Sequence, residues 1–240
     1  MRMKTVLING GSRGIGAAMV RAFGAAGYTV AFTYFSSDAE AEALARETGA
    51  LAIKADSASR EEIGAAVEKC LTAFGQIDVL INNAAISSFG LFTDMPNDIW
   101  DRMLAVNLDG PMQYAKHVLP QMISRKCGKI INISSMWGQV GASCEVEYST
   151  TKAALIGFTK ALAKEVGPSG ITVNAIAPGV IATEMNARLS EEDLEALKEE
   201  TPLSRIGTPE EVAAVALFLC GEGGNFMTGQ VLSPNGGFVM

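Results

Sequence analysis

Short apolar runs rich in Val, Ile and Thr alternate with longer amphipathic stretches along almost the whole chain. The runs lack apolar–polar alternation, which is typical of strands buried on both faces of a parallel sheet. The strands that this pattern predicts are Thr5–Asn9, Thr29–Tyr34, Leu51–Lys54, Val79–Ile81, Lys129–Ile133, Thr172–Ala175 and Val231–Ser233. The helices that it predicts between them are Ile15–Ala25, Ala39–Thr48, Glu61–Phe74, Asp98–Ser124, Val146–Val166 and Pro209–Leu219.

The alternation of strands and helices also predicts the topology. Each strand–helix–strand unit should form a right-handed crossover, and together the units should build a Rossmann-type, doubly wound α/β domain. We expect a seven-stranded parallel sheet with helices on both faces. Because no linker, repeat or low-complexity run divides the chain, residues 1–240 are expected to form one domain.

One segment, Met185–Arg205, differs from the rest by its run of acidic residues. The acids are most simply explained as the solvated face of a helix. The segment also follows the carboxyl end of a predicted strand, a position that suits a mobile lid over a site.

The composition narrows the classes of function. The chain has 240 residues, 48% of them apolar, and its net charge of −7 argues against a broad nucleic-acid footprint. The apolar run near the N-terminus is too short for a signal peptide, and no run reaches the roughly 18 apolar residues of a membrane-spanning helix. We therefore expect a cytoplasmic protein that binds neither nucleic acid nor membrane.

Cysteine and histidine usage limits metal and nucleophile chemistry. The four cysteines show no CxxC spacing and are interpreted as free thiols, with Cys70 and Cys220 packed in helices. His117 is the single histidine, so a His-based triad or a multi-histidine metal site is nearly excluded. No metal is expected.

A glycine-rich segment joins the first predicted strand to the first predicted helix. Gly10 allows a tight turn, Gly14 lets the backbone approach a pyrophosphate, and Gly16 permits close packing of helix and strand. The N–H groups at the start of the helix are then free to bind the anion. The residues predicted to hold a dinucleotide here are Gly10, Ser12, Arg13, Gly14, Ile15 and Gly16.

Charge around this loop favours NADP(H). A site for NAD usually has Asp or Glu at the end of the second strand, where the carboxylate holds the ribose hydroxyls. Here the strand is followed by Ser36 and Ser37, and the first acid, Asp38, is better explained as a helix cap. The Arg13 guanidinium can pair with a 2′-phosphate, helped by either serine hydroxyl. We therefore expect NADPH to be used in preference to NADH.

Tyr148 and Lys152 begin an apolar-striped helix, and their i, i+4 spacing puts them on one face. A free phenol has a pKa near 10 and is a poor acid or base at neutral pH. A neighbouring ammonium favours the phenolate and lowers that pKa. The pair is therefore a candidate for proton transfer, although a bare YxxxK pattern is common by chance.

Several motifs together resemble those of the short-chain dehydrogenase/reductase family. The loop of residues 10–16 is similar to the family's TGxxxGIG, with Asn9 in place of Thr, and segments 82–85 and 178–183 are similar to NNAG and PGxIxT. Asn9 is expected to brace a neighbouring loop, Asn83 to brace the central sheet, and Ala85 to have negative φ. The resemblance implies further cofactor contacts from Asp56, Ser57, Asn82, Ala84, Pro178, Gly179, Ile181 and Thr183, and also from Tyr148 and Lys152.

The resemblance also implies a catalytic set and a mechanism. Ser135, just past the fifth predicted strand, would stabilise the substrate oxyanion, while hydride passes from nicotinamide C4 to the carbonyl carbon. Tyr148 would donate the proton, and Lys152 would orient the nicotinamide ribose and lower the pKa of Tyr148. Asn107 would hold a water that links Lys152 to solvent.

Within the family, the pattern looks most like the 3-oxoacyl-(acyl-carrier-protein) reductases. This branch implies an NADPH-dependent carbonyl reductase, acting on a ketone that is either a small molecule or bound to acyl-carrier protein. Lys126 and Lys129 could present positive charge to that acidic partner, but Ser169 stands where such enzymes often carry Arg. A non-catalytic dinucleotide sensor is the lower-ranked alternative, because such proteins typically lose the Tyr or the Lys.

The segment before Tyr148 gives a second substrate hypothesis. The residues WGQVGASCEV resemble bacterial reductases that act on a 5-aminopentanone-modified lysine of elongation factor P. Glu145 and Glu147 would suit a cationic substrate, or they are simply acids favourable to a helix N-terminus. The residues proposed to line the substrate pocket are Trp137, Cys144, Glu145 and Met185.

Assembly is suggested by excess apolar surface. Asp98–Ser124 and Val146–Val166 carry more apolar residues than one sheet face needs, so both could pack across a two-fold axis in a homotetramer. The apolar C-terminal residues 237–240 could be buried in another interface.

Overall fold

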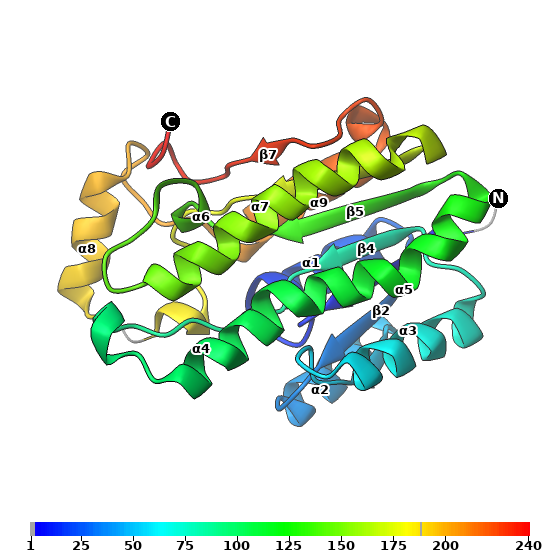
Figure 1. Cartoon of the computed structure of the whole chain (residues 1–240), viewed down its shortest axis with the longest axis horizontal. Helices are drawn as coiled ribbons and strands as arrows, with labels where there is room; N and C mark the ends of the chain where they lie inside the picture. The colour runs from blue at the N-terminus through cyan, green and yellow to red at the C-terminus, as the bar shows by residue number, and fades with distance from the viewer. Residues whose placement is uncertain (1–2, 188) are drawn as a thin grey trace.

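The computed structural model describes residues 3–187 and 189–240 and contains a seven-stranded sheet in the order β3-β2-β1-β4-β5-β6-β7. Every neighbouring pair of strands is parallel (Figure 1), so the predicted doubly wound fold class is confirmed. The strands are β1 (Thr5–Asn9), β2 (Thr29–Tyr34), β3 (Leu51–Lys54), β4 (Val79–Asn82), β5 (Gly128–Ile133), β6 (Ile171–Ile176) and β7 (Val231–Leu232).

The helices follow the predicted pattern with one interruption. They are α1 (Gly14–Ala25), α2 (Asp38–Thr48), α3 (Arg60–Phe74), α4 (Asn97–Leu104), α5 (Gly110–Arg125), α6 (Trp137–Val140), α7 (Val146–Val166), α8 (Glu191–Glu200) and α9 (Pro209–Cys220). The helix predicted for Asp98–Ser124 is present as one continuous helical stretch, but a π-helical turn, η2 (Ala105–Asp109), interrupts its α-helical pattern between α4 and α5. Such turns are frequent at functional sites.

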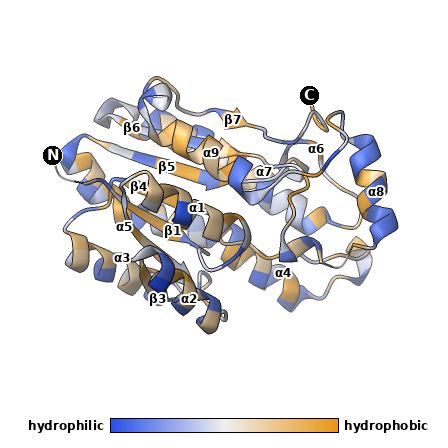
Figure 2. Ribbon diagram, turned by 180° about the vertical axis from the view of Figure 1, so that it is seen from behind, coloured by the Kyte–Doolittle hydropathy of each residue, from blue (hydrophilic) through white to orange (hydrophobic). Residues whose placement is uncertain are grey.

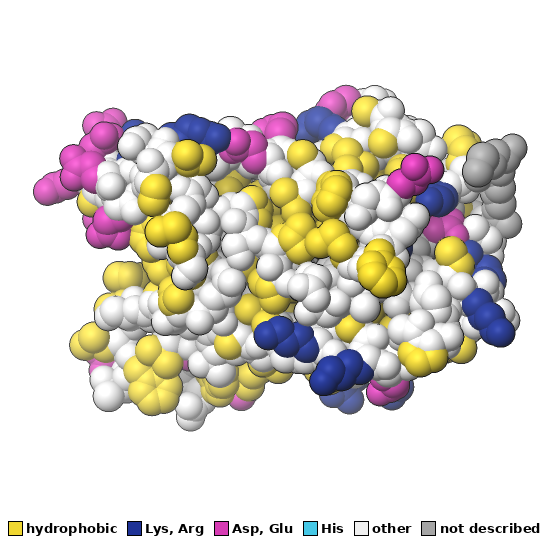
Figure 3. Space-filling view, turned by 90° about the horizontal axis from the view of Figure 1, so that it is seen from above, with side chains coloured by type: hydrophobic (Ala, Val, Ile, Leu, Met, Phe, Trp, Pro, Cys, Tyr) yellow, Lys and Arg dark blue, Asp and Glu magenta, His cyan; other side chains and the backbone are white. Residues whose placement is uncertain are grey.

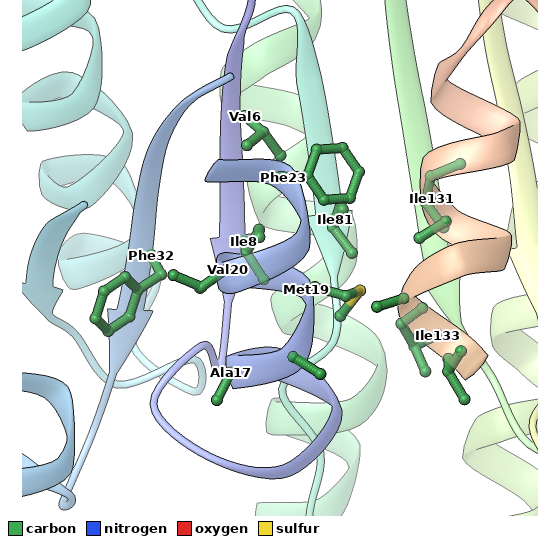
Figure 4. Packing of buried hydrophobic residues seen from close by; sticks show 14 of the residues in the cluster. Val6, Ile8, Ala17, Met19, Val20, Phe23, Phe32, Ile81, Ile131 and Ile133 are labelled. Carbon is green, nitrogen blue, oxygen red and sulfur yellow. The ribbon is translucent and has the colours of Figure 1, made fainter. Parts of the chain in front are cut away.

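Two apolar cores lie on opposite faces of the sheet. Val6 and Ile8 of β1 pack with α1, α2 and α9, whereas Leu7 between them packs with α3, α5 and α7. Figure 4 shows the first core, in which Met19 and Phe23 of α1 lie against the strands. The alternation of β1 side chains between the two faces places helices on both sides of the sheet, as Figure 2 shows from behind.

The strand order also locates a binding site. From β1 the chain first builds outward through β2 and β3, and then it returns to the other side of β1 to form β4. Loops that leave β1 and β4 therefore diverge at the carboxyl edge of the sheet, which is where ligands bind in folds of this kind.

The outer surface is mixed in character. Helix α8 is acidic and begins with a capping box between Ser190 and Asp193. Figure 3 shows acidic side chains gathered at the left end of one face, where Figure 1 places α8. None of the described helices is long and apolar enough to cross a membrane.

The burial of individual residues tests the predictions made for two of the cysteines and for the apolar C-terminal segment. Cys70 and Cys220 are buried, as predicted, and burial raises the pKa of each thiol to about 12. At the C-terminus, Phe238 packs edge-on against Trp137 of the same chain, with ring centroids 5.6 Å apart. Met240 is fully exposed, so only part of the C-terminal segment is covered within the chain.

Candidate active site

A cleft of about 610 Å³ opens at the carboxyl edge of the sheet, a volume suited to a small ligand or cofactor. Segments that follow six different strands line it, and most residues predicted for the site are among them. The predicted residues in the lining are Gly10, Ser12, Arg13, Gly14, Ile15, Gly16, Ser36, Ser37, Asp56, Ser57, Ala84, Ser135, Trp137, Glu145, Tyr148, Lys152, Pro178, Gly179, Ile181, Thr183 and Met185.

The loop between β1 and α1 has the geometry of a phosphate cradle. Gly10 has φ of +65°, and a Cβ on Gly16 would lie 2.0 Å from the carbonyl oxygen of Gly10, so neither position accepts a side chain without strain. Helix α1 has no side-chain cap and no acidic residue in its first turn. Its first N–H groups therefore remain available to an anion in the cleft.

A ladder of buried amides connects this loop to the rest of the site. Asn9 Nδ2 donates to Asn82 Oδ1 at 2.8 Å, Asn82 Nδ2 donates to Asn132 Oδ1 at 2.8 Å, and Asn132 Nδ2 donates to Thr159 Oγ1 at 2.8 Å. The ladder follows the strand register, since Asn9 pairs with Asn82 and Asn82 with Asn132. It ties β1, β4 and β5 to α7, the helix that carries Tyr148.

The ladder corrects the roles predicted for two neighbouring asparagines. Asn82 is buried in the sheet and does not line the cleft, whereas Asn83 does line it and donates to the Gly10 carbonyl oxygen at 2.8 Å. The bracing role of Asn9 is confirmed, because its Oδ1 accepts the backbone N–H groups of Asn83 and Ala84 at 2.7 and 2.6 Å. Ala85 is absent from the described non-glycine residues with positive φ, as predicted.

Charged groups gather where β2 and β3 end. Arg13 and the two serines Ser36 and Ser37 line the cleft. Asp38 does not, and its predicted cap role is wrong, because it is the first residue of α2 and binds Lys54 Nζ through both carboxylate oxygens at 2.8 Å. The cleft therefore has no acid at the end of β2.

Arg102 of α4 also lines this end of the cleft, although no motif in the sequence indicates it. Its guanidinium binds the Asp56 carboxylate and lies 5.3 Å from the centroid of the Phe35 ring. Arg102 and Asp56 are separated by 46 positions in the chain, so no local pattern could have indicated the contact.

At the other end, Ser135, Tyr148 and Lys152 come together around the end of β5. Lys152 Nζ donates to the Ile133 carbonyl oxygen at 2.8 Å and lies 5.6 Å from the centroid of the Tyr148 ring. Burial lowers the pKa of Lys152 to about 7. A lysine held in this way can exchange a proton near neutral pH.

The neighbouring serines have different surroundings. Ser134 Oγ donates to the Lys152 carbonyl oxygen at 2.8 Å, which fixes the strand end to α7. Ser135 Oγ accepts the backbone N–H of Trp137 at 3.1 Å, so its own hydroxyl hydrogen is available to another acceptor. This difference favours Ser135 as the residue that would meet a substrate.

Asn107 lies in the π-helical turn and is completely buried outside the cleft lining. Its side chain exchanges two hydrogen bonds with the backbone of Ile86, at 2.9 and 2.8 Å, and donates to Thr151 Oγ1 at 3.2 Å. The amide thus clamps the loop after β4 against α7. Its predicted role in holding a water stays a prediction.

Three of the four residues proposed to line the substrate pocket lie in the cleft lining. Trp137, Glu145 and Met185 line the cleft, whereas Cys144, which was also proposed for the substrate pocket, lies outside the lining. Cys144 has φ of +61° and its carbonyl oxygen accepts the N–H of Gly90 at 3.0 Å, so its backbone shapes the turn before α7.

Glu147 also lies outside the cleft lining, so it cannot present its charge to a substrate there as predicted. The residue is buried in α7, and neither of its carboxylate oxygens has a hydrogen-bond partner. An unpartnered buried carboxyl group costs folding free energy.

The basic residues expected at the mouth of the cleft are elsewhere. Lys126 directly follows α5 and Lys129 is near the start of β5, whereas the cleft lies at the opposite end of that strand. Lys129 Nζ binds the carbonyl oxygens of Leu219 and Gly221 at 2.9 and 3.1 Å. Both lysines are therefore at the amino edge of the sheet, and their predicted place beside the site is wrong.

Comparison with known proteins gives matches along almost the whole chain. A family model described as enoyl-(acyl carrier protein) reductase matches residues 10–239. The chain is 45% identical to a 3-oxoacyl-(acyl-carrier-protein) reductase of Aquifex aeolicus, over 98% of this chain and 96% of the relative. It is 42% identical to an acetoacetyl-CoA reductase of Shinella zoogloeoides, over 98% of each.

Two solved structures also match almost the whole chain. A blue fluorescent protein from a metagenomic library, in complex with NADPH, gives a TM-score of 0.93 at 35% identity, over 100% of this chain and 99% of that one. A variant of a Serratia marcescens short-chain dehydrogenase/reductase gives 0.91 at 37% identity, over 99% of this chain and 98% of that one.

Proposed function

The chain belongs to the short-chain dehydrogenase/reductase family, and from this premise we propose that it is an NADPH-dependent ketone reductase. The observation that carries the proposal is one continuous cleft with a phosphate cradle at its centre and Ser135, Tyr148 and Lys152 at one end. A reductase needs both parts, because the cofactor and the proton donor must meet at the same carbonyl group.

The cofactor assignment is supported by the residues that would hold each of its parts. The uncapped N-terminus of α1 suits the pyrophosphate, and Arg13 with Ser36 and Ser37 suits a 2′-phosphate. The cleft lining has no acid at the end of β2, where a carboxylate would repel that phosphate. Pro178, Gly179, Ile181 and Thr183 line the end at which the nicotinamide would lie, and we propose that they orient its ring.

When bound, NADPH supplies the hydride that reduces the carbonyl carbon. Ser135 would donate a hydrogen bond to the substrate oxygen as negative charge develops on it. Tyr148 would deliver the proton to that oxygen. Lys152 would then restore the proton to Tyr148, a role that fits its lowered pKa of about 7.

For the substrate we propose first a 3-oxoacyl thioester, carried by acyl-carrier protein or by coenzyme A. The support is the identity of 45% and 42% with relatives named for such substrates. Neither Lys126 nor Lys129 supports the docking of an acidic carrier protein, because both are at the far edge of the sheet.

One observation favours a second candidate, a ketone that carries a positive charge. Glu145, which directly precedes the helix of Tyr148 and Lys152, lines the cleft, and the basic residues of the lining other than the buried Lys152 are Arg13 of the phosphate cradle and Arg102 beside Asp56. A cationic substrate, such as the 5-aminopentanone-modified lysine of elongation factor P, would be attracted to the Glu145 carboxylate.

A parallel assay separates these candidates. NADPH oxidation is measured with acetoacetyl thioester and with an aminopentanone-modified peptide, for the parent and for Glu145→Gln. An acyl-thioester reductase should prefer the first substrate and be little changed by the substitution. A reductase of cationic ketones should prefer the second and lose several-fold in kcat/KM when Glu145 is neutralised. No turnover of any ketone by protein that binds NADPH would support the sensor alternative instead.

We also propose a homotetramer. Ile99 of α4, Met112 of α5 and Val146 of α7 are exposed apolar residues on the helices predicted to pair across a two-fold axis. Light scattering coupled to size-exclusion chromatography gives the mass in solution, and a monomer would contradict the proposal.

A further inference from the structure

An aromatic pair joins the C-terminal segment to the wall of the cleft. Phe238 packs edge-on against Trp137, with ring centroids 5.6 Å apart and the ring planes at 88°. Trp137 is the first residue of the short helix α6 and lines the cleft, whereas Phe238 lies outside the lining. Figures 1 and 2 both place the C-terminus near α6. Phe238 therefore supports a residue of the cleft wall without reaching the cleft itself.

The backbone of Trp137 is fixed beside the proposed reaction site. Its N–H donates to Ser135 Oγ at 3.1 Å, so the indole belongs to the part of the cleft where the group next to the ketone would lie. A Cβ on Gly138 would lie 2.7 Å from the carbonyl carbon of Lys152, which shows that α6 already presses against α7. These contacts hold the helix but not the indole ring, whose orientation depends on the side chains that touch it.

The turn that carries Phe238 is closed by the buried side chain of Asn235. Asn235 Oδ1 accepts the N–H of Gly237, and Nδ2 donates to the Val239 carbonyl oxygen, both at 2.9 Å. A Cβ on Gly179 would lie 2.8 Å from Asn235 Cα, so the turn also packs closely against the segment proposed to orient the nicotinamide. Phe238 is thus held by a turn whose own hydrogen bonds and packing are in place.

A second contact links the same turn to α6 but does not reach the indole. Ser233 Oγ donates to Gln139 Oε1 at 3.0 Å, and this hydrogen bond is exposed to solvent. Water competes for an exposed hydrogen bond, so the bond adds little to the stability of the arrangement. The edge-on contact of the two rings is therefore the support that acts on Trp137 directly.

We propose that Phe238 is a positioning residue that fixes the Trp137 indole as a rigid wall of the substrate end of the cleft, and that this wall selects ketones with an unbranched group next to the carbonyl carbon. A fixed wall rejects a branched group by steric clash. Without the Phe238 ring, the indole gains room to turn toward the space that the ring leaves, and the cleft accepts the larger group. The inference rests on the proposed function as a ketone reductase.

The test compares two β-ketoesters by steady-state kinetics with NADPH. Ethyl acetoacetate has a methyl group next to the ketone, and ethyl isobutyrylacetate has an isopropyl group there. The proteins are the parent, Phe238→Ala, the milder Phe238→Leu, Trp137→Ala and the double variant Trp137→Ala with Phe238→Ala. Met240→Ala is the matched control, because Met240 is fully exposed two residues later in the same segment. Thermal melting shows whether each variant is folded, and size-exclusion chromatography shows whether its assembly is unchanged.

A second readout reports on the indole itself. The chain contains two tryptophans, so Trp100→Phe leaves Trp137 as the only one. In that background Phe238→Ala should make the Trp137 fluorescence easier to quench with acrylamide, because the ring that covers the indole is gone. Met240→Ala should leave the quenching unchanged.

The parent and Met240→Ala should prefer ethyl acetoacetate in kcat/KM by about ten-fold or more, as expected when extra methyl groups meet a rigid pocket. Phe238→Ala should reduce this preference by about five-fold, through a gain with the branched ketone, and Phe238→Leu should reduce it less. The kcat with ethyl acetoacetate and the KM for NADPH should stay within about two-fold of the parent. The double variant should have the preference of Trp137→Ala alone, because Phe238 acts through Trp137.

Folded Phe238 variants that keep the preference of the parent would overturn the inference, whatever their fluorescence. An equal loss of kcat/KM with both ketones would also overturn it, because that is the effect of a merely structural role. So would a parent that uses the two ketones equally well. A parent that binds NADPH but reduces neither ketone would overturn the proposed function as well.

Discussion

Asn82 on β4 donates a side-chain hydrogen bond to Asn132 on β5, with 2.8 Å between Nδ2 and Oδ1, in a fully buried part of the sheet. The bond is the middle step of the amide ladder that joins the phosphate cradle to α7. The two ends of the proposed reaction site are thereby held in one rigid register, because buried and fully satisfied polar networks specify a single arrangement.

The first prediction tests this ladder through stability. Asn82→Ala removes a donor and an acceptor and leaves the partner atoms of Asn9 and Asn132 unsatisfied in the core. The free energy of unfolding should fall by about 2–4 kcal/mol, the cost of two buried groups without partners. Chemical denaturation measures it. Asn97→Ala, at an exposed position of α4, should change it by less than about 0.5 kcal/mol, and an equally small loss for Asn82→Ala would contradict the account.

The amide ladder also illustrates which parts of the structure could be predicted from the sequence. The buried apolar runs predicted the strands and their topology well, because a parallel sheet covered on both faces leaves a strong pattern. Strand β4, however, continues one residue past its predicted end at Ile81. Successive side chains of a strand point to opposite sides, so that single residue decided which asparagine braces the sheet and which lines the cleft. Because Asn82 and Asn83 are identical and adjacent, the sequence alone did not indicate which of them lies in the sheet and which lines the cleft.

Other features depend on contacts that no local pattern contains. The π-helical turn at Ala105–Asp109 interrupts a stretch whose apolar spacing is that of an ordinary helix, and Asn107 within it makes the tertiary hydrogen bonds with the backbone of Ile86. The amino-edge position of Lys129, by contrast, could have been predicted. Lys129 begins the predicted strand Lys129–Ile133 and Ser135 follows the end of that strand, so the two lie at opposite edges of a parallel sheet.

The second prediction concerns the choice of cofactor. Arg13→Ala removes the cation proposed for the 2′-phosphate, so the KM for NADPH should rise by about ten-fold or more, as expected for a lost charge-assisted hydrogen bond. The KM for NADH, which lacks that phosphate, should change little. Steady-state kinetics with both cofactors gives the values, and Arg46→Ala on the exposed side of α2 is the control. A parent that uses the two cofactors equally well would refute the assignment.

The third prediction follows from the buried lysine. Burial lowers the pKa of Lys152 to about 7 from 10.5, so between these values the unfolded chain binds a proton that the folded chain does not. The stability of the parent relative to Lys152→Met should therefore rise with pH over this window, by up to about 1.4 kcal/mol per pH unit. This stability difference should be constant below pH 7, because Lys152 is then protonated in both the folded and the unfolded parent.

Denaturant unfolding at a series of pH values measures this difference. Lys164→Met, at an exposed position later in α7, is the control and should show no such slope relative to the parent. If the stability of the parent relative to Lys152→Met stays level or falls between neutral and alkaline pH, the Lys152 side chain is not buried as a neutral amine.

The fourth prediction uses the unpartnered carboxyl group. Glu147→Gln keeps the shape of the side chain and replaces the unpartnered buried carboxyl group with an amide, which costs less to bury because it never carries a charge. The free energy of unfolding at neutral pH should increase by about 1–3 kcal/mol. Glu165→Gln, at an exposed position of α7, should leave it within about 0.5 kcal/mol of the parent. A destabilised Glu147→Gln protein would mean that the carboxylate is stabilised in a way the structure does not account for.

The most direct test of the proposed function is the turnover of Tyr148→Phe with NADPH and a ketone substrate, measured beside its affinity for NADPH. Removal of the phenolic hydroxyl leaves the ring in place but takes away the proposed proton donor. The kcat should fall by about 10²–10⁴-fold, the usual contribution of general acid catalysis, while the Kd for NADPH stays within a factor of about three. Tyr28→Phe, remote from the cleft, should behave as the parent. Turnover of Tyr148→Phe within about ten-fold of the parent would contradict the account.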